Sequence, residues 1–245
     1  MKYLIYFSSC LIFLLKNGFL LAGNLSGVTA TPDDSEAGAN TIYTISFTTS
    51  ASGTGLPANG KIIITFPAQF DASGVVLASF SPANGGFSSV NGSGNVVTLV
   101  RDGSGTAFGP SSSVTVQIAN VTNSKTTGSS FTVTVETQDN GGTNIDGPTG
   151  SANFSIIPAA LGSFTITGEP GSVTAGVAFT NGITVTAKDI FGNTKTNYLG
   201  TVSWSSSDGQ ASLPLDYTFQ GTDNGSHTFA GSGFVLKTAG GQTIT

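Results

Sequence analysis

The chain has 245 residues, eight of them basic and thirteen acidic, with a formal net charge of −5 at pH 7. Phosphate backbones are bound by clustered Lys and Arg, and the basic residues here are few and scattered, which excludes nucleic acid as a partner. Gly, Ser, Thr and Asn alternate with Val, Ile and Phe, a composition typical of strands and turns and unlike that of a disordered chain.

The first two dozen residues have the pattern of an export signal. Lys2 supplies a positive charge, and the apolar run at residues 3–15 has the length of a signal-peptide core. A polar interruption at residues 16–18 breaks the run before it reaches the roughly 20 residues that span a bilayer. Cleavage is predicted after Ala22. Because Leu20 stands at position −3, where a small residue is usual, an uncleaved segment remains the alternative and would be the chain's only membrane contact.

The predicted location is therefore secreted or on the cell surface. The single cysteine, Cys10, lies within the signal, so the mature chain is expected to fold by burying apolar residues without disulfides. Lys2 and Lys16 also lie in the signal, which leaves six basic and thirteen acidic residues in the mature chain.

Alternating apolar and polar residues, with Gly and Asn between the segments, fill the chain as far as residue 157, and no stretch has the 3.6-residue period of an amphipathic helix. Residues 23–157 are predicted to form one Ig-like β-sandwich domain. Seven strands are predicted at residues 42–47, 61–66, 75–80, 96–100, 114–118, 131–135 and 152–157. Turns are predicted at residues 57–60, 84–86, 91–92, 102–103 and 139–142, where Gly and Asn tolerate positive φ.

A hinge is predicted at residues 158–160, because Pro158 cannot extend a strand ladder and the alternation restarts at Leu161. Residues 161–245 are predicted to form a second domain. Its strands are expected at residues 161–166, 177–179, 183–187, 202–205, 217–219, 227–229, 234–236 and 242–245. The predicted fold class is thus all-β, with two tandem Ig-like β-sandwich domains after a signal peptide at residues 1–22.

A family resemblance lies in this second domain, over residues 173–245. It is carried by Thr174-Ala175-Gly176, Val185-Thr186-Ala187-Lys188-Asp189 with Gly192-Asn193, Ser206-Ser207-Asp208, residues 213–219, and Leu236-Lys237-Thr238-Ala239-Gly240 with Thr243-Ile244-Thr245. This segment, about one third of the chain, resembles the Ig-like repeats of large bacterial surface proteins, in the style of invasin and filamin domains. The resemblance implies an extracellular spacer or adhesive module without catalytic residues.

Residues 60–67, with Phe70 shortly after, are similar to a sandwich strand of bacterial surface adhesins, in a motif too short to be specific. In repeats of the second domain's type, the closing strand usually runs a few residues past the position of Thr245. We therefore expect the second domain to be truncated in its last strand and the chain to be the N-terminal part of a longer protein.

The residues that could carry chemistry are sparse. His227 is the only histidine, so a Ser-His-Asp triad could form only around it, and its neighbours Thr228 and Phe229 indicate a strand and a structural role. No Gly-x-Ser-x-Gly elbow is present, and metal sites built on cysteine or paired histidines are excluded by counting. No catalytic residues and no enzymatic activity are predicted.

Calcium is the one cofactor that the sequence leaves open, because it needs only oxygen ligands. A candidate loop holds Asp139, Asn144 and Asp146, with Asn140 between them, and a second acidic cluster holds Asp33, Asp34 and Glu36. Neither cluster has the spacing of an EF-hand, and turns select Asp and Asn for backbone reasons. Solvated loops are the simpler interpretation of both.

Two classes of function remain. The first is a non-catalytic structural or adhesive module, whose partners are an extracellular protein or glycan and the neighbouring modules of the same chain. The alternative is an accessory module of a secreted hydrolase, which would bind carbohydrate through exposed aromatic residues such as Tyr43, Tyr198 and Tyr217. These three share no common spacing, and Trp204 is predicted to be buried in the core.

Overall fold

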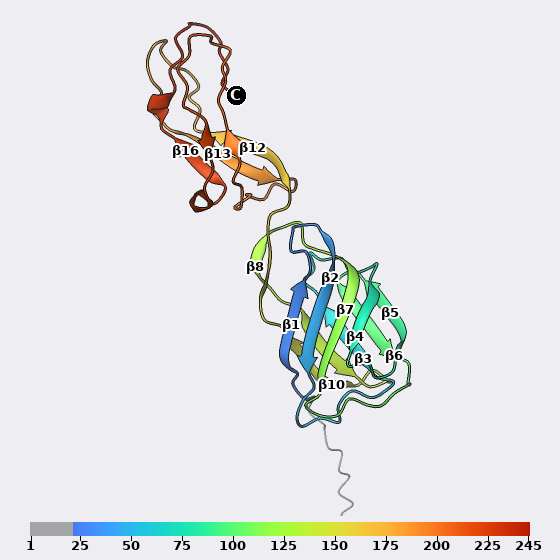
Figure 1. The fold of residues 1–245 in the computed structure, drawn as a ribbon. Helices are drawn as coiled ribbons and strands as arrows, with labels where there is room; N and C mark the ends of the chain where they lie inside the picture. The colour runs from blue at the N-terminus through green and yellow to red at the C-terminus, as the bar shows by residue number, and fades with distance from the viewer. Residues whose placement is uncertain (1–21) are drawn as a thin grey trace, which may run out of the picture.

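Two β-modules follow one another along an elongated molecule (Figure 1). The computed structural model describes residues 22–245, so the predicted signal peptide, apart from Ala22, lies outside the described residues. All named strand pairs are antiparallel, and within residues 22–245 the only helical elements are two three-residue 3-10 turns. The predicted all-β fold of tandem sandwiches is confirmed. Within the described part of the chain, no helix is long and apolar enough to cross a membrane.

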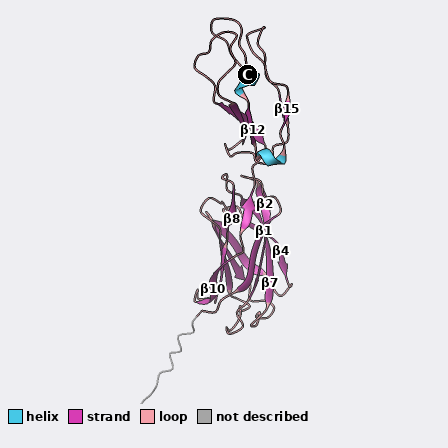
Figure 2. Cartoon of the chain, turned by 90° about the vertical axis from the view of Figure 1, so that its left-hand side faces the viewer, coloured by secondary structure: helices cyan, strands magenta, loops and turns pink. Residues whose placement is uncertain are grey.

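The first module is a sandwich of two sheets, seen from two sides in Figures 1 and 2. One sheet has the strand order β1-β2-β7-β4 and the other β10-β9-β3-β6-β5, while β8 and β11 form a separate pair. The strands are β1 (Ser26–Pro32), β2 (Asn40–Thr48), β3 (Lys61–Thr65), β4 (Val76–Ser81), β5 (Phe87–Ser93), β6 (Val96–Arg101), β7 (Ser113–Thr122), β8 (Gly128–Phe131), β9 (Thr134–Gln138), β10 (Asn144–Gly150) and β11 (Phe154–Ile156).

Period-2 alternation decides which face of each strand enters the core. In β2 the side chains of Tyr43, Ile45 and Phe47 are buried while their neighbours are half-exposed, and β7 repeats this pattern opposite it. An aromatic cluster fills one end of the sandwich, with Tyr43 contacting Phe66 edge to face at a centroid distance of 5.0 Å. Its other members are Phe70, Phe131 and Phe154. Phe47, Phe66 and Phe154 are buried, whereas Phe131 is half-exposed.

Several local predictions for this module were wrong. Strands β1, β5 and β10 were not predicted, and the expected turn at residues 91–92 lies inside β5, where Asn91 pairs with Thr98. The strand expected at residues 131–135 is divided between β8 and β9, which belong to different sheets. These segments contain Gly, Asn or Pro, and tertiary pairing overrides the turn preference of these residues.

The second module is smaller and has shorter strands. Its larger sheet has the order β12-β13-β16, and β14 and β15 form a separate two-stranded sheet. The strands are β12 (Leu161–Thr167), β13 (Ile183–Asp189), β14 (Thr201–Val202), β15 (Tyr217–Thr218) and β16 (Ser226–Phe229), with 3-10 turns η1 (Gly221–Asp223) and η2 (Gly231–Gly233). The strands expected at residues 177–179, 234–236 and 242–245 are reduced to isolated bridges.

The core of the second module is small and open on one side. Phe179, Ile183, Val185, Phe219, Phe229 and Phe234 are buried in it. Trp204, predicted to be buried, is only partly buried, with its ring edge-on to Phe229 and Phe234 at 5.1 and 4.9 Å. Beside it runs an apolar groove of about 290 Å³, lined by Phe164, Ile166 and Val202 among others.

Residues at the C-terminal end of the chain pair within this module. The Ser205 N–H donates to the Thr245 carbonyl and the Thr245 N–H donates to the Ser205 carbonyl, each at 2.9 Å. The Ser207 N–H donates to the Thr243 carbonyl at 3.1 Å, so a short antiparallel ladder is formed. Thr245 itself lies at the rim of the apolar groove.

Candidate functional site

His227, the only histidine, lies in a structural cluster of β16. Its ring stacks on Tyr217 at a centroid distance of 3.6 Å, and Nδ1 lies 3.3 Å from Asp223 Oδ1. Asp223 also accepts hydrogen bonds from the Gln220 N–H at 2.7 Å and from the Tyr217 hydroxyl. Hydrogen bonds from the backbone N–H of Gln220 and from the side chains of His227 and Tyr217 hold the pKa of Asp223 below its usual range. The cluster joins β15, η1 and β16 by side-chain contacts.

The candidate calcium residues are distributed over a turn and a strand. The Asp139 carboxylate accepts the Thr143 N–H at 2.8 Å and so caps its own turn. Asn144 and Asp146 lie on β10, where the Asn144 amide donates to the Gly147 carbonyl at 3.0 Å. Among residues 22–245 no three His, Cys, Asp or Glu side chains lie close enough to share a metal ion. Calcium binding here stays a prediction.

The other acidic cluster supports the end of the first module. Asp34 Oδ1 accepts the Glu36 N–H at 2.8 Å, while the Asn123 amide donates to the carbonyls of Asp34 and Glu36. Asn123 Oδ1 accepts the Tyr43 hydroxyl at 2.6 Å. The expectation that Tyr43 is an exposed aromatic residue for binding carbohydrate was therefore wrong. The Tyr43 side chain is fully buried, and burial raises the pKa of its hydroxyl.

The remaining aromatic candidates do not form a flat exposed platform. Tyr198 is wedged edge-on between Phe164 and Phe219, at 5.3 and 5.1 Å, and Tyr217 is stacked against His227. Stacking on a sugar ring requires an open aromatic face, and in both cases another ring covers part of the side chain. Tyr43 thus belongs to the core of the first module, and Tyr198 and Tyr217 pack against the core of the second.

A buried arginine, not recognised from the sequence, holds loops at the far end of the first module. Arg101 is 2% exposed, and its guanidinium donates to four backbone carbonyls, those of Leu56, Pro57, Asn84 and Thr106. It also lies over the Phe108 ring at 4.7 Å. Burial lowers the pKa of Arg101 from its usual value. Its contacts are all within the module, which indicates a structural role.

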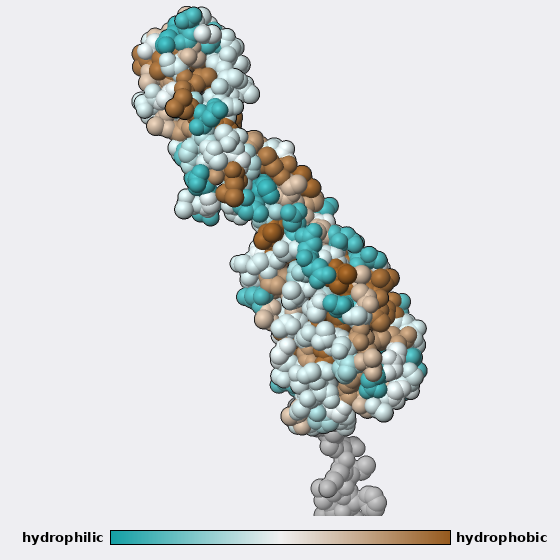
Figure 3. Space-filling model, in the orientation of Figure 1, coloured by the Kyte–Doolittle hydropathy of each residue, from teal (hydrophilic) through white to brown (hydrophobic). Residues whose placement is uncertain are grey.

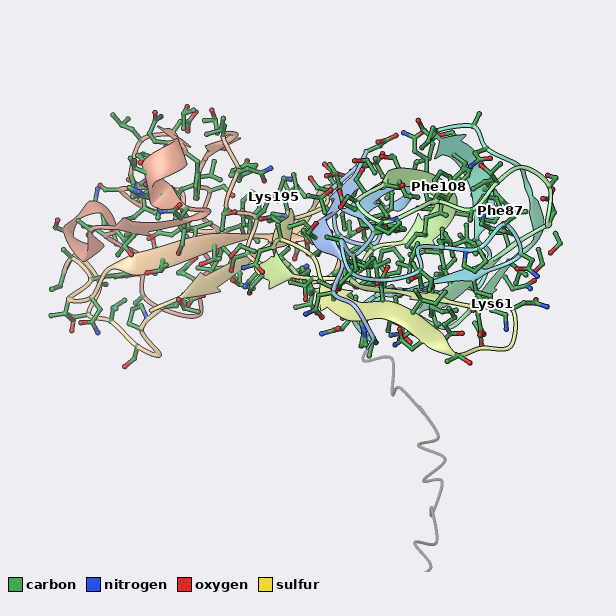
Figure 4. The ribbon with its side chains drawn as sticks, turned by 90° about the horizontal axis from the view of Figure 1, so that it is seen from below. Lys61, Phe87, Phe108 and Lys195 are labelled. Atoms are coloured by element: carbon green, nitrogen blue, oxygen red, sulfur yellow. The ribbon has the colours of Figure 1, made fainter. Side chains whose placement is uncertain are left out.

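A set of polar contacts also lies where the modules meet. The linker residues Pro158 and Ala159 are buried, and the backbone of Ala159 is held on both sides. Its N–H donates to Asp189 Oδ2 at 3.0 Å, and its carbonyl accepts Lys195 Nζ at 2.6 Å. The Ile190 N–H donates to the Ala160 carbonyl at 3.1 Å. Figure 4 shows Lys195 at the boundary between the two modules.

Asp189 organises the second module's side of this junction. It is 2% exposed at the end of β13, and it accepts the N–H groups of Phe191 and Asn193 at 2.9 and 2.8 Å in addition to that of Ala159. Burial alone would raise the pKa of Asp189, but hydrogen bonds from Asn193, Ala159 and Phe191 outweigh it and leave the pKa below its usual value. A tight turn follows Asp189, with Gly192 at φ +86°.

This turn, residues 189–195, also contacts the first module directly. The Asn193 amide donates to the Lys125 carbonyl at 2.8 Å, and the Thr127 N–H approaches Asn193 Oδ1 at 3.4 Å. The Phe191 ring lies against Gly38, where an added Cβ would come within 2.5 Å of it, and Lys125 Nζ lies 5.7 Å from the ring centre. Polar, apolar and cationic contacts therefore join the turn to two loops of the first module.

The loops that receive the turn are themselves fixed. Gly38 donates its N–H to the Ser124 carbonyl, and Ala37 donates to the Ile157 carbonyl at 2.9 Å. Asn123, next to Ser124, is tied to the core through the Tyr43 hydroxyl. A continuous chain of contacts thus runs from the aromatic cluster of the first module to β13 of the second.

Comparison with known proteins yields distant structural likenesses only. No family model matches the sequence, and no curated protein matches it. Solved structures with a similar arrangement include the sixth cohesin of scaffoldin B from Acetivibrio cellulolyticus, at 12% identity, covering 55% of this chain and 100% of that one, with a TM-score of 0.28. The major pilin subunit BcpA of Bacillus cereus has 12% identity, covers 87% of this chain and 56% of that one, and has a TM-score of 0.30.

A third likeness is the C-terminal domain of the antigen I/II-family protein AspA from Streptococcus pyogenes. It has 9% identity, covers 91% of this chain and 88% of that one, and has a TM-score of 0.33. Scores and identities this low assign no function, so the functional argument below is built on the residues of the chain.

Proposed function

We propose that this chain is an exported, non-catalytic spacer or adhesive module in which two β-sandwiches are held end to end at a fixed angle. The observation that carries the proposal is the junction, where Asp189, Asn193 and Lys195 bond both the linker and the loops of the first module. A flexible tether would need none of these bonds, since exposed linker backbone is satisfied by water. Holding the modules at one angle is what a spacer needs.

Other features support the same proposal. The charged and aromatic side chains with unusual surroundings, such as Arg101 and His227, have partners within their own module. The signal-like pattern of residues 1–22 supports export. The resemblance of residues 173–245 to bacterial surface repeats supports an array of such modules, and the gene sequence downstream tests this part of the proposal.

Distance measurement across the junction tests the proposal. Residues 23–245 contain no cysteine, so Ser93→Cys in the first module and Leu215→Cys in the second can carry spin labels at exposed positions. We expect one narrow distance distribution by pulsed electron paramagnetic resonance. Asn193→Ala combined with Lys195→Ala should broaden it, because the variant loses the bonds to Lys125 and Ala159.

A matched control is Asn197→Ala, an exposed asparagine of the same module, which should leave the distribution narrow. A distribution that is already broad in the unchanged protein would contradict a fixed junction and leave a flexible tether. Hydrolysis of a polysaccharide or peptide by the purified protein would contradict the non-catalytic part.

The accessory carbohydrate-binding function is the alternative, and the burial of Tyr43 weighs against it. Its remaining candidates, Tyr198 and Tyr217, lie in the second module. Affinity electrophoresis in soluble polysaccharides tests it: retardation that is lost in Tyr198→Ala or Tyr217→Ala would favour this alternative over the spacer.

A further inference from the structure

Asp146 is a buried carboxylate with one unused oxygen. Its side chain is fully buried on β10, at the far end of the first module from the junction. Oδ2 accepts the Ser50 N–H at 3.2 Å, whereas Oδ1 has no hydrogen-bond partner among the described residues. Burying a carboxylate without a countercharge costs several kcal/mol, so a buried acid of this kind calls for a partner.

No basic side chain of the described chain supplies that partner. The ion pair found within residues 22–245 joins His227 to Asp223, in the other module. On the strands packed against Asp146, Lys61 of β3 and Glu136 of β9 project to the opposite, half-exposed face of the sheet. Glu136 there accepts the amide of Gln138. The loop at residues 49–55, on the other side, contains no titratable residue.

Gly23 lies directly beside this carboxylate. It forms a parallel bridge with Asp146, with its N–H donating to the Ile145 carbonyl at 2.8 Å and its carbonyl accepting the Gly147 N–H at 2.7 Å. An ideal Cβ on Gly23 would overlap Asp146 Oδ1 and Ser50 Oγ. Nitrogen and Cβ are bonded to the same Cα, so the Gly23 nitrogen lies within about 5 Å of Oδ1. Only glycine fits at this position.

We propose that the α-ammonium group of Gly23, created when residues 1–22 are removed, is the ionic partner of Asp146 and locks the first module. The inference rests on the proposed export of the chain, together with the cleavage after Ala22 that the sequence predicts. An export peptidase would hydrolyse the Ala22–Gly23 amide with one water, leaving a carboxylate on Ala22 and an amine on Gly23 that takes up a proton. Of the three ammonium hydrogens, one keeps the bond to Ile145 and another is free for Oδ1.

A divalent cation is a weaker fit to the same carboxylate. Asp146 is the one acidic side chain at this point, because Asp139 is committed to its own turn. Calcium takes six to eight oxygen ligands and gains affinity from several carboxylates. The ammonium group, by contrast, is delivered by the chain itself and already has its backbone bonds in place.

The test compares two purified chains that differ by one residue at the N-terminus. One begins at Gly23, released by a protease that leaves this residue first, and the other begins at Ala22, which moves the ammonium one residue away. Each is also made with Asp146→Asn. Calorimetry follows the first module, and the fluorescence of Trp204, the only tryptophan, identifies the transition of the second.

We expect the chain that begins at Gly23 to have a first-module Tm about 4 °C higher at pH 6.5, and Asp146→Asn to abolish the difference. A carboxylate partner raises the pKa of an α-amino group above its ordinary value of about 7.7–8.0. The extra stability should therefore be complete below that range and lost as the pH rises through the raised value, so that the two chains melt alike at pH 10.5.

Equal Tm values for the two chains at pH 6.5 would overturn the pairing. So would stabilisation by added calcium that is the same in both chains and absent in Asp146→Asn, because it would give Asp146 to a metal ion. N-terminal mass spectrometry of the exported protein tests the cleavage separately. If the exported protein still carries residues 1–22, the proposed cleavage is wrong. A Tm difference between the two purified chains would in that case still support the pairing of the Gly23 ammonium group with Asp146.

Discussion

Asp208 shows how one buried side chain can hold a segment that has almost no regular structure. It is 4% exposed and accepts the N–H groups of Gln210, Lys237 and Thr238 at 3.0, 2.6 and 3.0 Å, together with the Thr238 hydroxyl at 2.8 Å. These bonds join the loop at residues 208–210 to the loop at residues 237–238, near the end of the chain. A carboxylate acting as a multiple acceptor does the work of a strand pair here.

Acid should weaken the second module through this residue. Hydrogen bonds from the backbone N–H of Gln210, from the hydroxyl and backbone N–H of Thr238 and from the backbone N–H of Lys237 hold the pKa of Asp208 well below its usual range. Burial opposes this shift but is outweighed. Because the folded pKa lies below the unfolded value of about 3.9, the stabilisation is complete above that pH and is lost as the pH falls below it. Trp204 fluorescence should show Asp208→Asn melting earlier than the unchanged protein at pH 7, with a difference that shrinks below about pH 4.

Asp216→Asn, at an exposed position nearby, is the control for this experiment and should have little effect at any pH. A destabilisation by Asp208→Asn that stays constant from pH 7 to pH 3 would show that packing, not the charge, is what the aspartate contributes.

At the scale of the elements, two glycines in strands of the first module differ in whether the structure has room for a side chain. Gly92 lies within β5, and an added Cβ would overlap the carbonyl oxygen of Ala72. The chain needs glycine there so that β5 can lie close to the backbone of the loop after Phe70. Gly150, at the end of β10, has open space where a Cβ would stand.

Replacing each of these glycines by alanine should separate the two cases. Gly92→Ala should destabilise the first module by about 2 kcal/mol or more, since backbone atoms cannot move aside cheaply. Gly150→Ala should be neutral or slightly stabilising, because alanine restricts the unfolded chain. Urea unfolding followed by circular dichroism measures both, and equal effects at the two positions would contradict the close approach of β5.

The same elements show how far a sequence can predict this fold. Strands such as β2 and β7 were predictable because their alternation comes from Val, Ile, Tyr and Phe, which favour strands independently of their neighbours. Strand β5, by contrast, contains Asn91-Gly92, which local rules assign to a turn. It becomes a strand because its backbone pairs with β6, and such long-range pairing leaves no local signal.

In the candidate sites too, local features could be predicted from the sequence, whereas contacts with other elements could not. The turn at Asp189 was predictable from Asp-x-x-Gly-Asn, because these residues favour tight turns through their own backbone. That Asp189 also binds Ala159 of the linker was not, since the partner lies on another element. Likewise, Asp146 was singled out as an acidic loop residue, but its burial next to Gly23 depends on the packing of the complete sheet.

At the scale of the whole molecule, the exposed apolar side chains of the described residues are divided unevenly between the two modules. In the view of Figure 3, apolar side chains are scattered in small groups between polar ones over both modules. Of the ten exposed large hydrophobic side chains in the described residues, eight belong to the second module, whose core is the smaller and more open. A small module of this kind gains stability from any neighbour against which it packs.

The junction should therefore couple the unfolding of the two modules. Destabilising the first module by Gly92→Ala is expected to lower the Trp204 transition of the second as well, by about 4 °C, because the turn at residues 189–195 loses the surface against which it packs. With Asn193→Ala and Lys195→Ala in the background, the same Gly92→Ala change should leave the Trp204 transition where it is. The comparison is a double-mutant cycle across the junction, and its coupling energy is expected to be about 1 kcal/mol. If Gly92→Ala does not change the Trp204 transition either in the otherwise unchanged chain or in the Asn193→Ala/Lys195→Ala variant, the junction fixes the angle between the modules without coupling their unfolding.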